Sequence, residues 1–410
     1  MTAQSIGLRR VRWLVPVGVA ASLMLAACSS SSTATDSSAA PAASGAAPAA
    51  SSAAPASAPA MSAQEVAVAT FSKDLCEPKD PAAVADIPAS VSGFTGYDSE
   101  PGDWLALPTT SPLAGKRVAL SVMGLGQPFF LAIKGHWEEL AAQYGFELKV
   151  YDGKFDAGTV QKIVDDIIAD KPDAVAFAPL DSDASVPQIQ KFLDAGIPTV
   201  TYNVQPRKVL TPRVFADDFA GSQSVGCNAG AYFAAQFPGA QANIGIVDLP
   251  ALPQVQDRKN GFLYGFLSQL PNAQVVGTVD GGGVIDKALP AATDLIQAHP
   301  DMNVIFGIND DSSLGTIAAL KAAGKYTTDW GVLSAVDGSG PAMAAMVDPA
   351  TPYMAESGYP PLDFSSATFN LLGATVEKKT KASTQVVVGY PPIDPSVDGI
   401  ATWLSSQYPE

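Results

Sequence analysis

The chain has 410 residues, of which 47% are hydrophobic, and this composition excludes a wholly disordered protein. It carries 40 Asp and Glu residues against 24 Lys and Arg residues, and the net charge of −16 argues against a nucleic-acid partner, because such a surface repels phosphate groups. With only two histidines and three cysteines, zinc sites of the His/Cys kind and His-based catalytic triads are nearly excluded.

Residues 1–27 have the features of an export signal. Three arginines between positions 9 and 12 precede an apolar run over residues 13–27. This run of about 15 residues is shorter than the ~20 needed to span a bilayer, which favours a cleaved signal peptide. The run ends in an LAAC motif that resembles the lipobox of bacterial lipoproteins, and this resemblance implies that Cys28 becomes the lipidated N-terminus. In the alternative, the leader is an ordinary signal peptide and Cys28 has no role.

Two segments follow that do not predict a domain. Residues 28–63 consist almost entirely of Ala, Ser, Thr and Pro, with one charged residue, and cannot bury enough apolar surface to fold. We expect them to form a tether from lipidated Cys28. Residues 64–111 are rich in Pro, Gly and Asp, and we expect an irregular N-terminal extension there. This organisation predicts a protein that is anchored to the outer face of the cell membrane and works outside the cytoplasm.

The location bears on the remaining cysteines. If Cys28 is lipidated, Cys76 and Cys227 are the only thiols left in an oxidising compartment, and two such thiols more often pair than stay free. We therefore expect a disulfide between them. The alternative is that Cys227 lies buried as a small hydrophobic residue while Cys76 stays exposed.

From residue 116 onward, short β-branched runs alternate with amphipathic stretches. This alternation predicts parallel sheets covered by helices, an α/β fold. The runs form two similar series that divide near residues 215–219, so we expect two doubly wound, Rossmann-like lobes. The predicted strands are 117–123, 147–151, 174–180 and 198–203 in the first series, and 243–249, 274–279, 303–308 and 331–336 in the second; the predicted helices include 128–144, 160–169, one ending at 193, and 226–237.

Ligands of open α/β sheets bind beyond the carboxyl ends of the strands. The segments that follow the predicted strands carry many amides and carboxylates, few cations and one pair of aromatic residues. Carboxylates accept hydrogen bonds from hydroxyl groups, amides and arginine donate them, and aromatic faces cover C–H surfaces. The sequence therefore predicts a site for a neutral polyhydroxyl ligand.

Six short motifs carry a family resemblance. Each is weak by itself, but in this order and spacing they resemble the ribose-binding-protein family, the type I periplasmic sugar receptors of ABC importers. The resemblance covers about residues 116–392, and it implies two lobes that are joined by three hinge crossings and close on a sugar. The motifs are QPFF at 127–130, PLDSD at 179–183, GIPTV at 196–200, DRKNGF at 257–262, FGIND at 306–310 and VDG at 336–338.

The resemblance also implies ligand-binding residues. Phe129 and Phe130 match the stacking aromatic residues of the family, and Gln127 matches a polar ligand contact. Three further positions match ligand hydrogen-bonding residues without a change of residue type: Arg258, Asn309 and Asp337. We expect Asp311 or Ser312 to cap the next helix, which leaves Asn309 for the ligand.

Other positions depart from the family pattern. Asn203 and Val204 occupy the place of an Asp–Arg pair in the ribose binder, and glycines at 281–283 replace a stacking Phe of the second lobe. A hinge Gln of the family falls near Ser357. These departures imply a ligand other than ribose, such as another sugar, a polyol or a cyclitol. We retain Asn203 as a ligand contact. At the first crossing between the lobes we retain Asp218, although Asp217 is equally well placed.

The resemblance and the pattern together set the expected domains. We expect residues 112–217 with 358–392 to form the N-terminal lobe, and residues 218–357 with 393–410 to form the C-terminal lobe.

An enzyme fits the sequence less well. GLG at 124–126 and Asp152 faintly resemble a dinucleotide-binding fingerprint, but Phe129 occupies the third glycine position. The chain has no Gly-x-Ser-x-Gly elbow and no Walker A loop, and its export leader argues against a transcription regulator. We therefore expect a monomeric, non-enzymatic sugar-binding protein without catalytic residues, metal or cofactor, which requires a separate ABC permease and ATPase. A sensory receptor that presents its ligand to a membrane partner remains an alternative, as does a surface-anchored carbohydrate-active enzyme.

Overall fold

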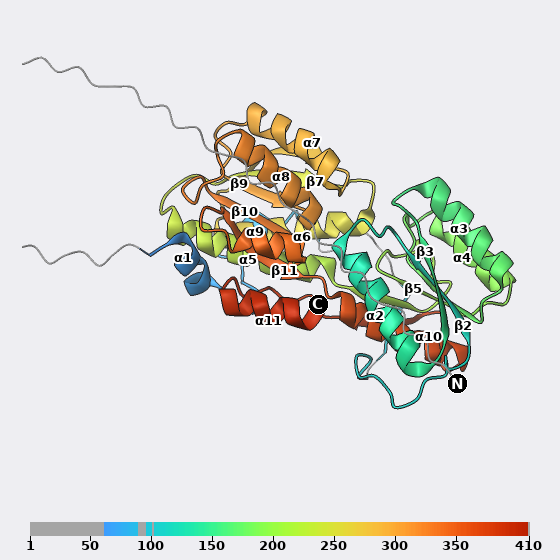
Figure 1. The fold of residues 1–410 in the computed structure, drawn as a ribbon. Coiled ribbons are helices and arrows are strands. Elements are labelled where there is room, and N and C mark those ends of the chain that lie inside the picture. The colour runs from blue at the N-terminus through green and yellow to red at the C-terminus, as the bar shows by residue number, and fades with distance from the viewer. Residues whose placement is uncertain (1–60, 89–95, 101, 409–410) are drawn as a thin grey trace, which may run out of the picture. The chain divides into compact units, whose positions relative to one another are not determined.

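The structure, a computed structural model, describes residues 61–88, 96–100 and 102–408 (Figure 1). The expected signal peptide, Cys28 and almost all of the expected tether lie outside these residues. Within the described part of the chain, no helix is long and apolar enough to cross a membrane.

Seven parallel strands form the first sheet, in the order β1-β12-β6-β5-β4-β2-β3. Helices α2 and α10 pack on one face of this sheet, and α3 and α4 pack on the other. The elements are β1 (Asp98–Ser99), β2 (Arg117–Val122), α2 (Pro128–Tyr144), β3 (Glu147–Asp152), α3 (Ala157–Asp170), β4 (Ala174–Phe177), α4 (Ser185–Asp194), β5 (Thr199–Tyr202), β6 (Arg213–Ala216), α10 (Pro361–Val376) and β12 (Thr384–Val388).

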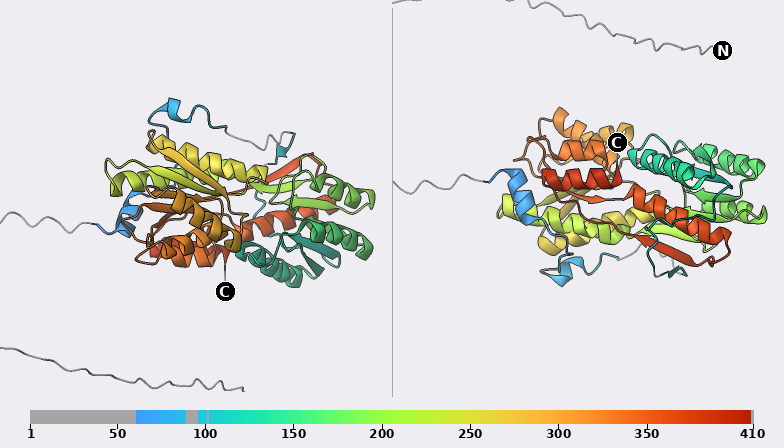
Figure 2. Two further views of the ribbon diagram at one scale, coloured as in Figure 1. Left: turned by 90° about the horizontal axis from the view of Figure 1, so that it is seen from above. Right: turned by 60° about the horizontal axis from the view of Figure 1, so that its bottom comes forward.

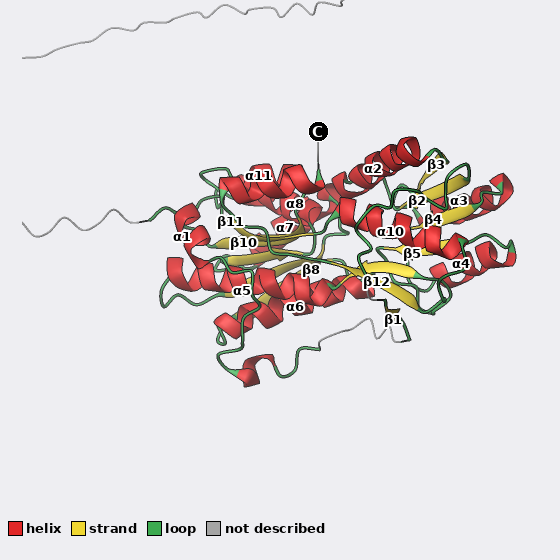
Figure 3. Ribbon diagram, turned by 90° about the horizontal axis from the view of Figure 1, so that it is seen from below, coloured by secondary structure: helices red, strands yellow, loops and turns green. Residues whose placement is uncertain are grey.

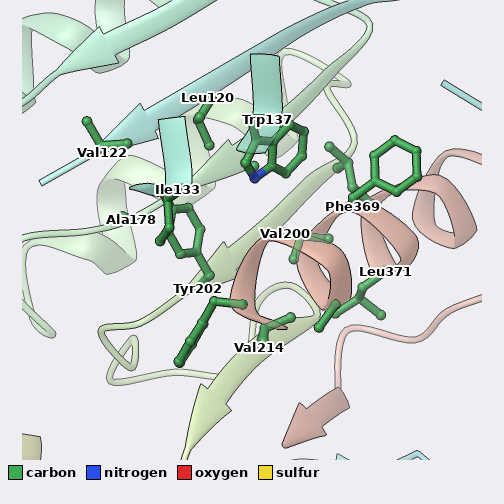
Figure 4. Packing of buried hydrophobic residues seen from close by; sticks show 14 of the residues in the cluster. Leu120, Val122, Ile133, Trp137, Ala178, Val200, Tyr202, Val214, Phe369 and Leu371 are labelled. Atoms are coloured by element: carbon green, nitrogen blue, oxygen red, sulfur yellow. The ribbon is translucent and has the colours of Figure 1, made fainter. Parts of the chain in front are cut away.

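Alternating side chains of the strands fill the two faces of this sheet. Leu120 points into the cluster beneath α2 and α10, where Trp137 and Phe369 also lie (Figure 4), whereas its neighbour Ala119 points into the cluster beneath α3 and α4. Successive residues of a strand face opposite sides, so a strand that is buried on both sides is apolar at nearly every position. This explains why β2 was recognisable from its sequence.

Five parallel strands form the second sheet, in the order β11-β10-β9-β7-β8. Helices α5 and α6 cover one face, and α7, α8, α9 and α11 cover the other (Figure 3). The elements are α5 (Asp218–Gln236), β7 (Asn243–Asp248), α6 (Pro253–Gln269), β8 (Gln274–Asp280), α7 (Ile285–Ala298), β9 (Val304–Gly307), α8 (Asp310–Ala322), β10 (Val332–Asp337), α9 (Gly340–Met346), β11 (Tyr353–Gly358) and α11 (Val397–Gln407).

The chain passes between the two sheets three times: from β6 to α5, from β11 to α10, and from β12 to α11 (Figure 2). The second and third crossings touch each other, because Ser357 and Pro392 form an antiparallel bridge. The predicted fold class, two doubly wound α/β lobes with three crossings, is confirmed. The residue boundaries proposed for the lobes stay a prediction.

Four strands were not predicted from the sequence: β1, β6, β11 and β12. β11 is instructive because all six of its residues are buried, although Glu356 and Ser357 are polar. Its burial comes from tertiary packing against β10 and α5, which a search for apolar runs cannot detect. Helix α5 also begins at Asp218, eight residues before the expected start at 226.

The extension differs from our expectation of an irregular segment. Helix α1 (Ala63–Thr70) begins with a capping box in which the Ser62 side chain accepts from the Glu65 amide and Glu65 accepts from the Ser62 amide. Ala63 and Ala67 are buried against the cluster of α5 and α6. The Ser62-x-x-Glu65 spacing is typical of a capping box, and it places the start of this helix at the end of the segment 28–63 that we expect to be a tether. Farther along, β1 adds an edge strand to the first sheet beside β12.

A disulfide joins Cys76 of the extension to Cys227 of α5, with 5.7 Å between the Cα atoms. Next to it, the side chain of Asn228 accepts from the Ser72 amide at 2.7 Å and donates to the Ser72 carbonyl at 3.0 Å. The predicted pairing is therefore present in the structure, and it fastens a segment with little core of its own to the second half of the protein.

This disulfide gives a first prediction. The full-length chain, denatured without reductant, should show at most one reactive thiol, that of Cys28. Replacing both Cys76 and Cys227 with Ser should lower the unfolding free energy by about 2–5 kcal/mol, because the bridge closes a long loop. Thiol titration and urea denaturation measure both effects. Two or more reactive thiols in the unreduced protein would contradict the pairing.

Candidate functional site

A cavity of about 570 Å³ lies beyond the carboxyl ends of strands from both sheets. In parallel sheets, the segments that follow the strands meet at one edge, and ligand sites form there. Of the eight residues predicted to bind a ligand, seven line this cavity: Gln127, Phe129, Phe130, Asn203, Arg258, Asn309 and Asp337. The eighth, Asp218, contacts Arg258 instead.

Two adjacent aromatic residues begin helix α2 on the side of the first sheet. Pro128 occupies the first turn of the helix, where its missing N–H costs nothing, and Phe129 and Phe130 follow. Their rings meet edge to face at 5.0 Å, and both are almost fully buried although both line the cavity. Both rings thus pack in the core and also face the cavity, where the family resemblance places stacking aromatic residues.

The guanidinium group of Arg258 is the centre of the polar part of the site. Its Nε donates to Asp218 Oδ1 at 2.7 Å, and its Nη1 donates to Asp337 Oδ1 at 3.2 Å and to the Ile308 carbonyl at 3.1 Å. The guanidinium also lies 4.9 Å from the ring centre of Tyr359, within the range of a cation–π interaction. Asp218 thus holds Arg258 in place from behind, while Arg258 and Asp337 reach the cavity.

Burial changes the ionisation of the two acids. It raises the pKa of Asp218 to about 6 and that of Asp337 to about 7, and the positive charge of Arg258 opposes both shifts. At neutral pH the Asp218–Arg258 pair is therefore ionised, whereas Asp337 titrates near neutrality. Asp337 also has a backbone φ of 135°, an unusual value for a residue with a side chain, and such strained positions concentrate at functional sites.

Asn203 reaches the cavity from the end of β5. Its φ of 67° lies in the left-handed region, which Asn tolerates better than most residues. The Oδ1 atom of Asn203 accepts from the Tyr359 hydroxyl at 3.1 Å, so the first sheet is linked to the crossing that follows β11.

Gln127 connects the two halves of the protein directly. Its Nε2 donates to the Gly283 carbonyl at 3.1 Å and lies 3.4 Å from Asp311 Oδ2. Asn309 donates to the same carbonyl at 3.0 Å, and its Oδ1 accepts from the Ser312 amide at 3.0 Å. Asn309 is therefore the N-cap of α8, and our expectation that Asp311 or Ser312 would cap this helix is wrong. Asn309 lines the cavity, but much of its hydrogen-bonding capacity is already used by these two bonds.

The comparisons with known proteins agree with this arrangement. A family model described as a periplasmic binding protein domain matches residues 118–359. The chain belongs to this family. The ribose import binding protein RbsB of Bacillus subtilis is 27% identical over 258 residues, which cover 62% of this chain and 80% of the relative. The D-ribose/D-allose-binding protein of Pseudomonas aeruginosa is 28% identical over 221 residues, which cover 51% and 67%.

Solved structures show the same fold. A periplasmic solute-binding protein of an ABC transporter from Actinobacillus succinogenes, with bound D-allose, superposes with a TM-score of 0.62 at 23% identity and covers 70% of this chain and 99% of its own. The myo-inositol-binding protein of Caulobacter gives a TM-score of 0.62 at 20% identity and covers 72% and 97%. The chain is thus a type I periplasmic binding protein by sequence family and by fold, and this family consists of binding proteins for transport, not of enzymes.

Several residues at the cavity of this binding protein were not predicted from its sequence. Tyr359 lines it, whereas Ser357, where the family resemblance placed a hinge contact, is fully buried and bonds to Ser224 and the Gly221 carbonyl. Tyr359 follows β11, so recognising that strand would have pointed to it. Lys154 and Lys287 line exposed parts of the cavity. In the described residues, no group of His, Cys, Asp or Glu side chains is arranged to hold a metal ion.

A buried acidic pair lies beside the site. The Tyr353 hydroxyl donates to Glu356 Oε2 and lies 3.3 Å from Asp310 Oδ1, while Asp310 Oδ2 accepts from the Ser339 amide at 2.6 Å. Burial raises the pKa of both carboxyl groups well above their ordinary values, and the nearby Asp310 adds to the shift of Glu356. Because a buried charge without a cation is costly, the folded protein favours the protonated form of these carboxyl groups.

This pair gives a second prediction. Because burial raises the pKa of Glu356 above its ordinary 4.5, the folded protein binds this proton more tightly than the unfolded chain does, and the unfolding free energy should fall as the pH rises above 4.5. The side chain of Glu356→Gln is neutral at every pH. The unfolding free energy of this variant should therefore fall by about 1–3 kcal/mol less than that of the wild type between pH 5 and pH 8. Urea denaturation at both pH values measures the difference. The exposed Glu147→Gln serves as a control that should match the wild type, and an unchanged pH dependence in Glu356→Gln would contradict the assignment.

Proposed function

We propose that this chain is the lipid-anchored solute-binding protein of an ABC importer, which captures a sugar or sugar-like polyol in the cavity and delivers it to a membrane permease. Membership of the periplasmic binding protein family and the sugar-binding names of its relatives support this ligand class. One observation carries the proposal most directly: an aromatic pair from the first sheet and the Arg258–Asp337 pair from the second line the same cavity.

These groups suit a sugar. The rings of Phe129 and Phe130 would cover the C–H surface of a pyranose or furanose. Asp337, whose Oδ1 accepts from Arg258, would accept hydrogen bonds from ligand hydroxyls with its other oxygen, and Arg258 would donate to a ring or hydroxyl oxygen. Asn203 would complete the set from the end of β5.

Capture would proceed by closure of the two halves. Because the cavity is lined from both sheets, a ligand that touches both favours the closed arrangement over an open one. The three crossings would act as the hinge, and the bond from Gln127 to Gly283 is one that an open arrangement would lose.

The sequence outside the described residues supports the location and the partners. The LAAC motif and the tether after Cys28 fit a lipoprotein held outside the cytoplasm, and the family name fits the same compartment. The chain has no Walker A loop, so a separate ATPase and permease would power import. The binding protein itself would act as a monomer.

Carbohydrate binding is the third prediction. Isothermal titration of the full-length protein against a panel of sugars, polyols and cyclitols should find a ligand, and Arg258→Ala and Asp337→Ala should each weaken its binding by about 10–100-fold, because each leaves a buried polar partner unpaired. Arg117→Ala, at the opposite end of β2, should leave the affinity unchanged. If either cavity variant binds the ligand with wild-type affinity, the residue that it replaces does not take part in binding.

The same interaction should depend on pH. A hydroxyl that donates to Asp337 favours the ionised carboxylate, so affinity should fall as the pH drops below about 7, the pKa of Asp337. Asp218, with a pKa of about 6, titrates in the same range, so Asp337→Asn and Asp218→Asn should be titrated in parallel with the wild type. A pH dependence that persists in Asp337→Asn would assign it to Asp218 or to another group.

The anchor is the fourth prediction. In its host cell, the wild-type protein should incorporate a labelled fatty acid and remain with the membrane fraction. Cys28→Ser should lose the label and appear in the soluble fraction, and uptake of the ligand by the cells should fall. Label retained in Cys28→Ser would contradict lipidation at this residue. Normal uptake in cells without the protein would favour a sensory role over transport.

A further inference from the structure

The hydrogen-bonding groups are unevenly distributed around the cavity. Side chains that donate or accept follow β2, β5, β9 and β10, where Gln127, Asn203, Asn309 and Asp337 lie. The segment that follows β7 differs, because its residues that are described as lining the cavity before Arg258 are all apolar. We call these residues the apolar wall: Leu249, Ala251, Leu252 and Val255.

Much of the N–H capacity of the backbone around the apolar wall is already used or absent. Pro250 and Pro253 lie within the segment and have no N–H group. The Leu249 amide donates to Asp248 Oδ1 at 2.7 Å, the Leu252 amide to the Leu249 carbonyl at 3.3 Å, and the Val255 amide to the Leu252 carbonyl at 3.0 Å. A ligand hydroxyl that faces these side chains would therefore meet C–H groups, and the amides of Leu249, Leu252 and Val255 are already bonded.

The first sheet adds further apolar surface to the same cavity. Met123 follows β2, Leu180 follows β4 and Val204 follows β5, and all three line the cavity. Val204 is almost fully buried, and it stands where the family resemblance implies an arginine. The cavity thus combines a polar region around Arg258 with apolar surface from both halves of the protein.

We propose that the ligand of this cavity is a sugar that carries an apolar substituent, a deoxy methyl group or a short O-linked alkyl group, which packs against the apolar wall. This inference rests on the proposed sugar-binding function. A hydroxyl group loses its hydrogen bonds with water when it is buried there, whereas a methyl or methylene group gains from leaving water. The polar region around Arg258 binds the remaining hydroxyls.

Matched ligands test the proposal on the wild-type full-length protein. The pairs are D-galactose with D-fucose, D-ribose with 5-deoxy-D-ribose, and D-glucose with methyl and butyl β-D-glucopyranoside. Isothermal titration should show at least one pair in which the apolar member binds tenfold or more tightly than its hydroxylated parent. Parents that bind as tightly as their partners in every pair would overturn this inference and leave the proposed function standing. The absence of binding by every carbohydrate tested would overturn both.

Variants of the wall locate the effect. Leu252→Asn, and the nearly isosteric Val255→Thr, each place a hydrogen-bonding group on the wall and should reduce the preference for the apolar member at least threefold. Val275→Asn, a half-exposed position on β8 outside the cavity, is the matched control and should keep the full preference. A preference unchanged in both folded wall variants would overturn the assignment to residues 249–255. The wild-type pairs remain decisive if Leu252→Asn does not fold.

Discussion

The ion pairs of the buried Arg258 guanidinium group are the interactions on which the site and the arrangement of the three crossings both depend. The guanidinium pairs with Asp218, the first residue of α5 after the first crossing, and with Asp337 at the end of β10. It also lies 4.9 Å from the ring of Tyr359 at the second crossing and 5.9 Å from the ring of Tyr390 at the third. A buried cation without these partners would cost several kcal/mol, typically about 3–5, so the three crossings are held around one charge.

This arrangement joins the polar part of the cavity to the segments that a closing motion would bend. Tyr359 is the link, because its hydroxyl donates to Asn203 of the first sheet while its ring faces Arg258 of the second half. A ligand hydroxyl that donates a hydrogen bond to Asp337 would change the charge balance around the guanidinium group of Arg258. In the proposed function, the side chains that bind the ligand therefore also contact the crossings, so no further residues are needed to couple ligand binding to closure.

How much the sequence predicts depends on whether a feature is local. The strand β2, the helix α2 and the α/β alternation follow from apolar periodicity, and the family resemblance pointed to seven residues that line one cavity. Features that arise only from tertiary contacts were missed. Strand β11, which contains Glu356 and Ser357, is buried by its neighbours and was not predicted. Tyr359, which directly follows this strand, was therefore not predicted either. For Asn309, two local roles compete, and only the bond to the Ser312 amide identifies it as a helix cap.

The geometry around Arg258 is set in part by residues that never touch the cavity. Asp218 lies on α5 and Arg258 on α6, and these helices approach so closely that a Cβ atom at Gly261 would lie 2.1 Å from the Phe219 carbonyl oxygen, one turn from the ion pair. The same holds farther along, where a Cβ at Gly265 would lie 2.1 Å from the Gln223 carbonyl oxygen, next to the disulfide of Cys227. A side chain at either glycine would push the helices apart, and because the Asp218–Arg258 contact is only 2.7 Å long, that displacement would reach the buried charge. The glycines of α6 therefore act on the site through backbone packing, which the composition of the cavity alone does not reveal.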